Sequence, residues 1–206
     1  MLGAALSPAA PAPQAAAGEA QQALRKAVAF HRLARDMTLR FRAVTYNPDL
    51  DKRDSYQGKL VLKDSTRFRL ETPGGTYVSD GVTFWEYHPQ NRQVVIRSAR
   101  DAANNPPGEV LLRFLDSDPL SLEKVKAGGK EYLKLRLDPS RAMKNLDSLA
   151  VLLNPSDYSV HTIGSRDASG NETEYTLVSV KRNAGVKDKV FVFQPPKGAD
   201  VVDMRE

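Results

Sequence analysis

Residues 37–43 read MTLRFRA, and their apolar and hydrophilic side chains alternate one by one. Neighbouring residues of a β-strand point to opposite faces, so Leu39 and Phe41 are expected to share one face. Arg40 and Arg42 then lie together on the other. Such a strand buries one face against a core and leaves the other in water. The stretch therefore predicts a half-exposed β-sheet.

The same period of two recurs along most of the chain, between segments rich in Gly, Pro, Asn and Asp. These turn signals come at intervals of roughly ten residues, which favours one continuous antiparallel sheet, curled or closed. Asp80-Gly81 predicts the turn of a hairpin. We expect a mainly β protein with few helices, and strands at residues 37–43, 56–62, 67–71, 93–97, 122–126, 133–137, 149–153, 158–163, 173–181 and 190–193.

The first 17 residues, MLGAALSPAAPAPQAAA, are rich in Ala and Pro and show no periodicity. They lack the charged start and the apolar stretch of ~7–15 residues that a complete signal peptide carries. We interpret residues 1–17 as a flexible leader or signal-peptide remnant, and residues 18–206 as a single domain. Early in that domain, apolar spacings of three and four predict a helix with one apolar side, formed by Leu24, Ala27, Val28, His31 and Ala34.

The composition excludes several kinds of site. The chain of 206 residues contains no Cys, which rules out disulfides and thiolate metal sites. Its three histidines, His31, His88 and His161, share no ligand spacing, so we expect no metal site. No apolar run approaches the ~18 residues that a membrane-spanning helix needs, and we expect a soluble protein.

A net charge of +5 raises the question of nucleic acid. A nucleic-acid-binding face gathers Lys and Arg residues into one cluster. Here they alternate with apolar residues, as in Lys134–Arg136, which is typical of the hydrated face of a sheet. The chain also lacks a nucleophile elbow, a phosphate-binding Gly loop and a dinucleotide fingerprint. We therefore expect a binding protein, with no enzymatic activity, no cofactor and no nucleic-acid partner.

Two stretches, SDGVTFWEYHPQNRQV (79–94) and FVFQPPKGADVVD (191–203), resemble the periplasmic outer-membrane lipoprotein carriers, the LolA family. The resemblance covers about residues 18–203, because LRFRAVTYN (39–47), GKLVLKDSTRFRLETP (58–73) and NPPGEVLLRF (105–114) follow in the same order. It implies an incomplete, strongly curved antiparallel β-barrel of about eleven strands, with helices covering its mouth. It also implies a monomeric periplasmic carrier that takes acylated lipoproteins from an inner-membrane ABC transporter to an outer-membrane lipoprotein receptor.

In such a barrel the inner face is both core and cargo site. We expect ten residues to contact lipid: Leu39, Phe41, Leu60, Leu62, Phe68, Leu70, Trp85, Tyr87, Leu135 and Phe193. Phe68 matches a position at the mouth of the family's cavity. Phe191 and Phe193 fill opposite faces of the strand expected at 190–193, so they cannot both point inward. The apolar residues of a short helix near residue 110 are expected to form a lid over the mouth: Val110, Leu111 and Phe114.

One position departs from the family. In the LolA family, an Arg that follows the second strand bonds to the lid and holds the empty form shut. The resemblance places Asp64 at this position in the present chain. Arg67 is three residues further on. Because Arg67 alternates with Phe68, we expect it to point outward, and we favour a lid held by packing alone.

Other functions remain open on the sequence. The same fold could serve a periplasmic lipid-sensing regulator or a LolB-like lipoprotein receptor, although a receptor of that type is lipidated and this chain has no Cys. A small-molecule enzyme in a barrel would need a polar cluster inside, which the pattern does not indicate. The identity of the cargo and the number of its acyl chains are not encoded in a recognisable motif.

Overall fold

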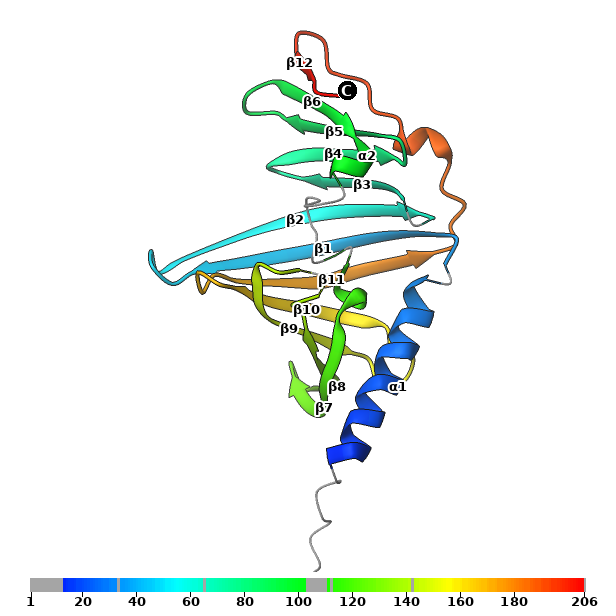
Figure 1. Cartoon of the computed structure of the whole chain (residues 1–206), viewed down its shortest axis with the longest axis vertical. Coiled ribbons are helices and arrows are strands. Elements are labelled where there is room, and N and C mark those ends of the chain that lie inside the picture. Colours follow the sequence, from blue (N-terminus) through cyan, green and yellow to red (C-terminus); the bar gives the residue numbers. More distant parts are fainter. Residues whose placement is uncertain are drawn as a thin grey trace, which may run out of the picture.

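Twelve strands form one open sheet in the computed structural model, which describes residues 13–32, 34–64, 66–102, 111, 113–141 and 143–205 (Figure 1). The strands are β1 (Asp36–Asn47), β2 (Lys52–Lys63), β3 (Arg67–Thr72), β4 (Gly75–Asp80), β5 (Thr83–His88), β6 (Gln93–Ser98), β7 (Asp118–Ala127), β8 (Lys130–Asp138), β9 (Leu146–Leu153), β10 (Val160–Asp167), β11 (Glu172–Arg182) and β12 (Asp200–Asp203). The helices are α1 (Pro13–Arg32) and α2 (Ala99–Ala102), with 3₁₀ turns η1 (Phe114–Asp116) and η2 (Asp188–Phe191).

The strand order is β12-β6-β5-β4-β3-β2-β1-β11-β10-β9-β8-β7. Neighbours are antiparallel throughout, except that β12 pairs with β6 in parallel. The two edge strands, β12 and β7, do not pair with each other, so the curved sheet stays open. The expectation of a half-open, mainly β architecture is confirmed. Among the antiparallel pairs of the described strands, only β1 with β11 joins segments that are distant in sequence.

Helix α1 covers one face of the sheet at its β7–β8 end (Figure 1). It begins at Pro13, earlier than the sequence periodicity predicted. Pro is tolerated in the first turn of a helix, because an N–H at this position would have no intrahelical acceptor. Its buried stripe is made mostly of Ala, which lets the helix axis approach the sheet closely: Ala20, Ala23, Leu24 and Ala27. The helix and the sheet thus enclose the core between them.

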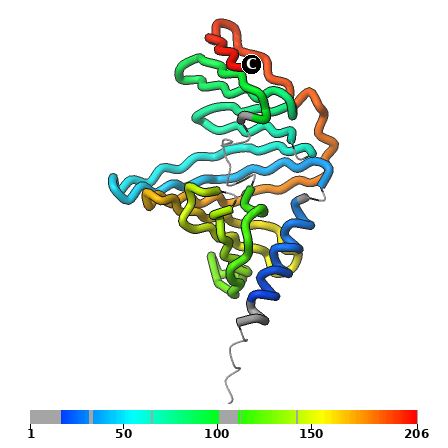
Figure 2. The backbone as a smooth tube through the Cα atoms, viewed as in Figure 1, coloured from blue at the N-terminus to red at the C-terminus, as the bar shows by residue number. Residues whose placement is uncertain are grey.

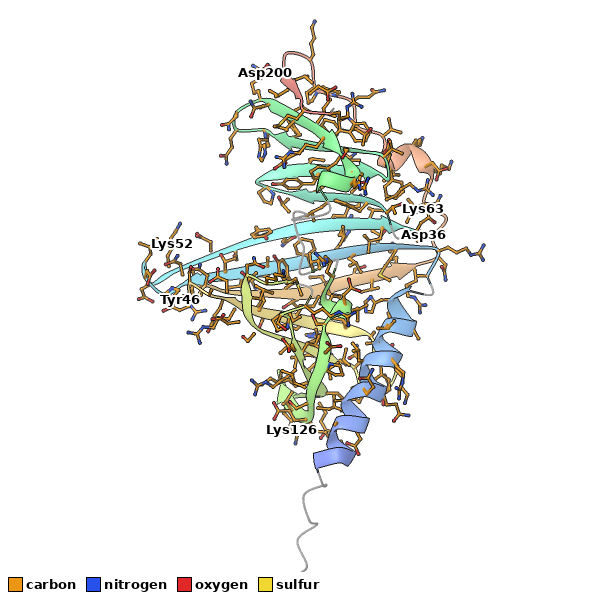
Figure 3. All side chains as sticks on the ribbon, viewed as in Figure 1. Asp36, Tyr46, Lys52, Lys63, Lys126 and Asp200 are labelled. Carbon is orange, nitrogen blue, oxygen red and sulfur yellow. The ribbon has the colours of Figure 1, made fainter. Side chains whose placement is uncertain are left out.

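The C-terminal segment leaves β11 and runs past the ends of β2–β5 to reach β6 (Figure 2). The buried carboxylate of Asp36 holds its start, because it accepts the backbone N–H groups of Ala184, Gly185 and Val186 at 2.8, 3.1 and 3.3 Å. Lys63 donates to the carbonyl of Val186 at 2.8 Å. Figure 3 shows Asp36 and Lys63 at the same end of β1 and β2, beside this segment.

The strand predicted at residues 190–193 is wrong. Residues 188–191 form the 3₁₀ turn η2, with the N–H of Val190 donating to the carbonyl of Lys187 at 3.0 Å. The apolar run reflects burial and not strand pairing, since Phe191 is only 1% exposed although this stretch joins no ladder. The sheet is extended later, by β12, a short strand that the pattern did not predict.

Candidate functional site

The inner face of the sheet, defined as the face covered by α1, carries a continuous row of aliphatic side chains. Leu39 of β1 lies opposite Leu60 of β2, which in turn lies opposite Leu70 of β3. Leu135 of β8, in the other half of the strand order, belongs to the same hydrophobic cluster on this face. Residues directly opposite in adjacent strands share a face, so the row crosses β1–β3 without a polar break, and Tyr77 of β4 and Glu86 of β5 follow it on the same face.

Seven of the ten residues predicted to contact lipid lie together on this inner face. Five are buried in the cluster, and Leu62 and Phe68 are half-buried and pack against it. The seven are Leu39, Phe41, Leu60, Leu62, Phe68, Leu70 and Leu135. The arrangement provides an extended apolar surface of the kind that acyl chains require.

Trp85, Tyr87 and Phe193 do not lie there, which corrects the expectation from sequence. The hairpin register places Ser79 opposite Phe84 and Val78 opposite Trp85. Because Ser79 lies opposite Phe68, the inner position of β5 belongs to Phe84, whose ring centroid is 5.9 Å from that of Phe68. A shift of one residue exchanges the two faces of a strand.

The opposite, outer face therefore holds the other aromatic residues of β5. The rings of Tyr87 and Phe193 are 5.9 Å apart between centroids, so the C-terminal segment covers this side. Phe191 packs on the same side, where the Arg67 guanidinium lies 5.7 Å from its ring centroid. Neither Phe of the FVF stretch reaches the inner face, and both contribute to the packing of the C-terminal segment.

Two of the three residues predicted to form a lid are described. Leu111 and Phe114 are buried and belong to the same cluster as the inner-face leucines. Val110 lies outside the described residues. Phe114 lies in η1, and its ring packs edge-on against that of His31 of α1, with centroids 5.8 Å apart. This segment thus joins α1 to the apolar face.

Arg67 points to the outer face, as expected from its alternation with Phe68. Its Nε donates to the Asp64 carboxylate at 2.9 Å, and a terminal nitrogen donates to Asp188 at 2.9 Å. The Asp64 carboxylate and then the Asp188 carboxylate hold the pKa of Arg67 above its usual value. Among the described residues these contacts tie Arg67 to the C-terminal segment.

A buried nitrogen without a described partner lies at the C-terminal end of α1. His31 contacts the ring of Phe30 at 5.2 Å between centroids, and its Nε2 is buried with no hydrogen-bond partner among the described residues. Burial, reinforced by the positive charge of Arg182, lowers the pKa of His31 to about 4. The imidazole is therefore neutral at physiological pH.

The far end of the inner face is aromatic. Phe41 packs edge-on against Tyr56 and Tyr175, with ring centroids 6.3 and 5.6 Å apart. Burial raises the pKa of Tyr175 far above its usual value, so its hydroxyl stays protonated. The aromatic side chains at this end of the inner face are therefore uncharged.

A hollow of about 500 Å³ lies on the outer face across β1, β2 and β8–β11. Uncharged residues such as Val44 and Ala150 contribute to its lining, together with six charged side chains: Arg53, Lys134, Arg136, Arg166, Glu172 and Glu174. Charged side chains lose hydration when an acyl chain covers them, so this hollow is unsuited to lipid.

The described residues show neither of two other features. None of their helices combines the length and apolarity needed to cross a membrane. They also contain no group of three or more His, Cys, Asp or Glu side chains placed to hold a metal ion.

Known proteins resemble this chain in sequence. The model of the family described as "Outer membrane lipoprotein carrier protein LolA" matches residues 32–194. An outer-membrane lipoprotein carrier protein of Pectobacterium carotovorum subsp. carotovorum is 29% identical over 153 residues, 73% of this chain and 72% of the relative. One from Haemophilus influenzae is 29% identical over 152 residues, 72% of this chain and 71% of the relative.

Solved structures share the fold. An uncharacterized conserved protein from Thermus thermophilus aligns with a TM-score of 0.58 at 17% identity, over 90% of this chain and 99% of that one. The Mycobacterium tuberculosis lipoprotein LppX aligns with a TM-score of 0.53 at 9% identity, over 82% and 98% of the two chains. At such identities the likeness concerns the fold alone. The family model spans most of the chain, and the protein belongs to the LolA family of outer-membrane lipoprotein carriers.

Proposed function

We propose that this protein is a periplasmic carrier that binds the acyl chains of lipoproteins on its inner face and shuttles lipoproteins from the inner to the outer membrane. The observation that carries the proposal is the large apolar cluster on the inner face of an open sheet. The relatives named above as lipoprotein carriers support the same role. On this proposal the protein acts by binding and not by catalysis.

The energetics of acyl chains explain why an apolar face on an open sheet suits this task. Each buried methylene contributes ~0.8 kcal/mol, so a chain of about fifteen gains on the order of 12 kcal/mol relative to water. Release of such a chain into water is therefore too slow to be useful. Transfer to another apolar site is nearly neutral, because that site provides almost the same burial.

The carrier consequently needs direct contact with the protein that donates the cargo and with the one that receives it. We propose an inner-membrane lipoprotein-releasing ABC transporter as donor and an outer-membrane lipoprotein receptor as acceptor. Leu111 and Phe114 form the cover of the apolar face, which moves aside when cargo enters. An open sheet suits this step because its two edges are not joined.

Binding of a fluorescent fatty-acyl probe to the full chain tests the proposal. We expect a saturable rise in fluorescence that a synthetic triacylated lipopeptide reverses. Native mass spectrometry of protein purified from membranes is expected to find lipid or lipopeptide bound to it. Linear, unsaturable fluorescence with no displacement contradicts the carrier function.

A further inference from the structure

Arg182 is a cation on the apolar inner face. It is the last residue of β11 and lies opposite Met37, which is buried in the core cluster. Two residues earlier, Val180 packs against the same cluster opposite Leu39. The side chain of Arg182 is half-buried and therefore belongs to the end of the surface that the proposed function assigns to acyl chains.

The guanidinium of Arg182 is held by an aromatic ring and not by a carboxylate. Its central carbon lies 4.3 Å from the ring centroid of Phe30 in α1. Its Nε is buried and has no hydrogen-bond partner, and no ion pair joins the side chain to an acid in the described part of the chain. Stacking leaves the N–H groups along the edge of the guanidinium able to donate.

His31 adds a second unsatisfied nitrogen at the same place. It follows Phe30 directly, and the Phe30 ring that the Arg182 guanidinium contacts lies 5.2 Å from the imidazole between centroids. Its buried Nε2 lacks a partner in the described part of the chain, and the rings of Phe30 and Phe114 flank the imidazole. Buried polar atoms without partners cost free energy, and such groups are tolerated where a ligand completes them.

We propose that Arg182 and His31 form the polar end of the acyl-binding face and hold the oxygen atoms at the head of an acyl chain. This subsite rests on the proposed function. Its ligand has an apolar tail, which lies along the inner-face leucines, and a carbonyl or carboxylate head. The guanidinium donates to either kind of oxygen, and the neutral imidazole can donate one N–H.

Competition against the uncharged dye N-phenylnaphthylamine tests the subsite, because this dye has no oxygen atom. Palmitic acid and methyl palmitate, which differ in the charge of the head, compete with the dye for the full chain. We expect Arg182→Met to lower the affinity for palmitic acid about tenfold, equivalent to about 1.4 kcal/mol, and the affinity for methyl palmitate about threefold. Dye affinity itself stays within a factor of two.

Two further variants sharpen the result. Arg42→Met removes a cation from the outer face of β1 and is expected to leave both competitors unchanged. Arg182→Lys keeps the charge and is expected to recover part of the affinity for palmitic acid. Should Arg182→Met fail to fold, His31→Phe replaces it as the test. It removes the ring nitrogens and keeps an aromatic ring, and it is expected to lower the affinity for methyl palmitate about threefold as well.

The outcomes separate this inference from the proposed function. Loss of affinity for both competitors assigns the subsite to carbonyl oxygens in general, and loss for palmitic acid alone assigns it to a carboxylate. Unchanged competition in Arg182→Met, or equal weakening of dye and competitors, overturns the subsite. A wild-type protein that binds no dye contradicts the proposed function as well.

Discussion

The ring of Phe41 lies against the backbone of Gly58, its cross-strand partner on β2. A Cβ atom at residue 58 would lie 2.3 Å from Cζ of Phe41, so no side chain fits there unless the ring moves. The ring is fully buried and touches Tyr56 and Tyr175 as well. Glycine at this position therefore makes room for the ring of Phe41, one of the largest fully buried side chains.

Gly58→Ala is expected to destabilise the protein by about 1–3 kcal/mol, because overpacking forces the Phe41 ring out of its position. Urea unfolding measures the change in the free energy of unfolding. Gly164→Ala on β10 is the matched control, since no atom lies within 4 Å of its added Cβ. That control is expected to be neutral or to stabilise by up to about 1 kcal/mol. Equal effects of the two substitutions contradict the packing argument.

The division of aromatic residues between the two faces predicts different effects of the same substitution. Phe68→Glu places a carboxylate on the inner face, where an acyl chain would strip it of water, so we expect loss of acyl-probe binding in a folded protein. Trp85→Glu places the same charge on the outer face and is expected to change probe affinity less than about twofold. Fluorescence titration measures both, with circular dichroism as the folding check. The reverse pattern places the cargo on the outer face.

Much of the sheet could be predicted from sequence because its strands are half-exposed. In Leu39–Ala43 and Leu133–Leu137, charge on one face leaves only one interpretation of the apolar side. The stretch Phe84–Tyr87 was ambiguous, because Phe84 and Trp85 offer a large apolar ring to each face. Only the pairing across the Asp80-Gly81 turn decides between them. The inner aromatic residue could have been found by counting register outward from that turn.

Other features could not be inferred from a local pattern. The apolar run at residues 190–193 has the composition of a strand, but the carboxylate of Asp36, more than 140 positions earlier, fixes where the segment starts. A contact of that range leaves no periodic signal. The unsatisfied nitrogens of His31 and Arg182 are equally invisible in sequence, since the helical period places His31 on an apolar side but does not show whether its nitrogens have partners.

The lowered pKa of His31 predicts that stability depends on pH. The folded protein takes up a proton at about pH 4, and the unfolded chain near 6.5, so the unfolded state binds more protons between these values. Stability therefore falls as the pH decreases through this window. Urea unfolding measures the free energy of unfolding at pH 7.5 and at pH 4.5. We expect the decrease between these two values to be about 2–3 kcal/mol larger in wild type than in His31→Phe.

His88 and His161 remain in both proteins, so the comparison isolates His31. The replacement ring keeps the aromatic contacts to Phe30 and Phe114. Equal acid sensitivity of the two proteins means that His31 titrates normally in the folded state.

The last prediction separates the two segments that border the sheet. Arg67 bonds to Asp188 and stacks on Phe191, so Arg67→Ala is expected to speed hydrogen exchange in residues 187–193. Residues 111–117 and acyl-probe affinity should stay unchanged, the latter within about twofold, well under the tenfold worth about 1.4 kcal/mol. Leu111→Ala removes a buried contact of the cover and is expected to speed exchange in residues 111–117 alone. Should Arg67→Ala expose residues 111–117 while Leu111→Ala does not, the cover is held by charge and not by packing.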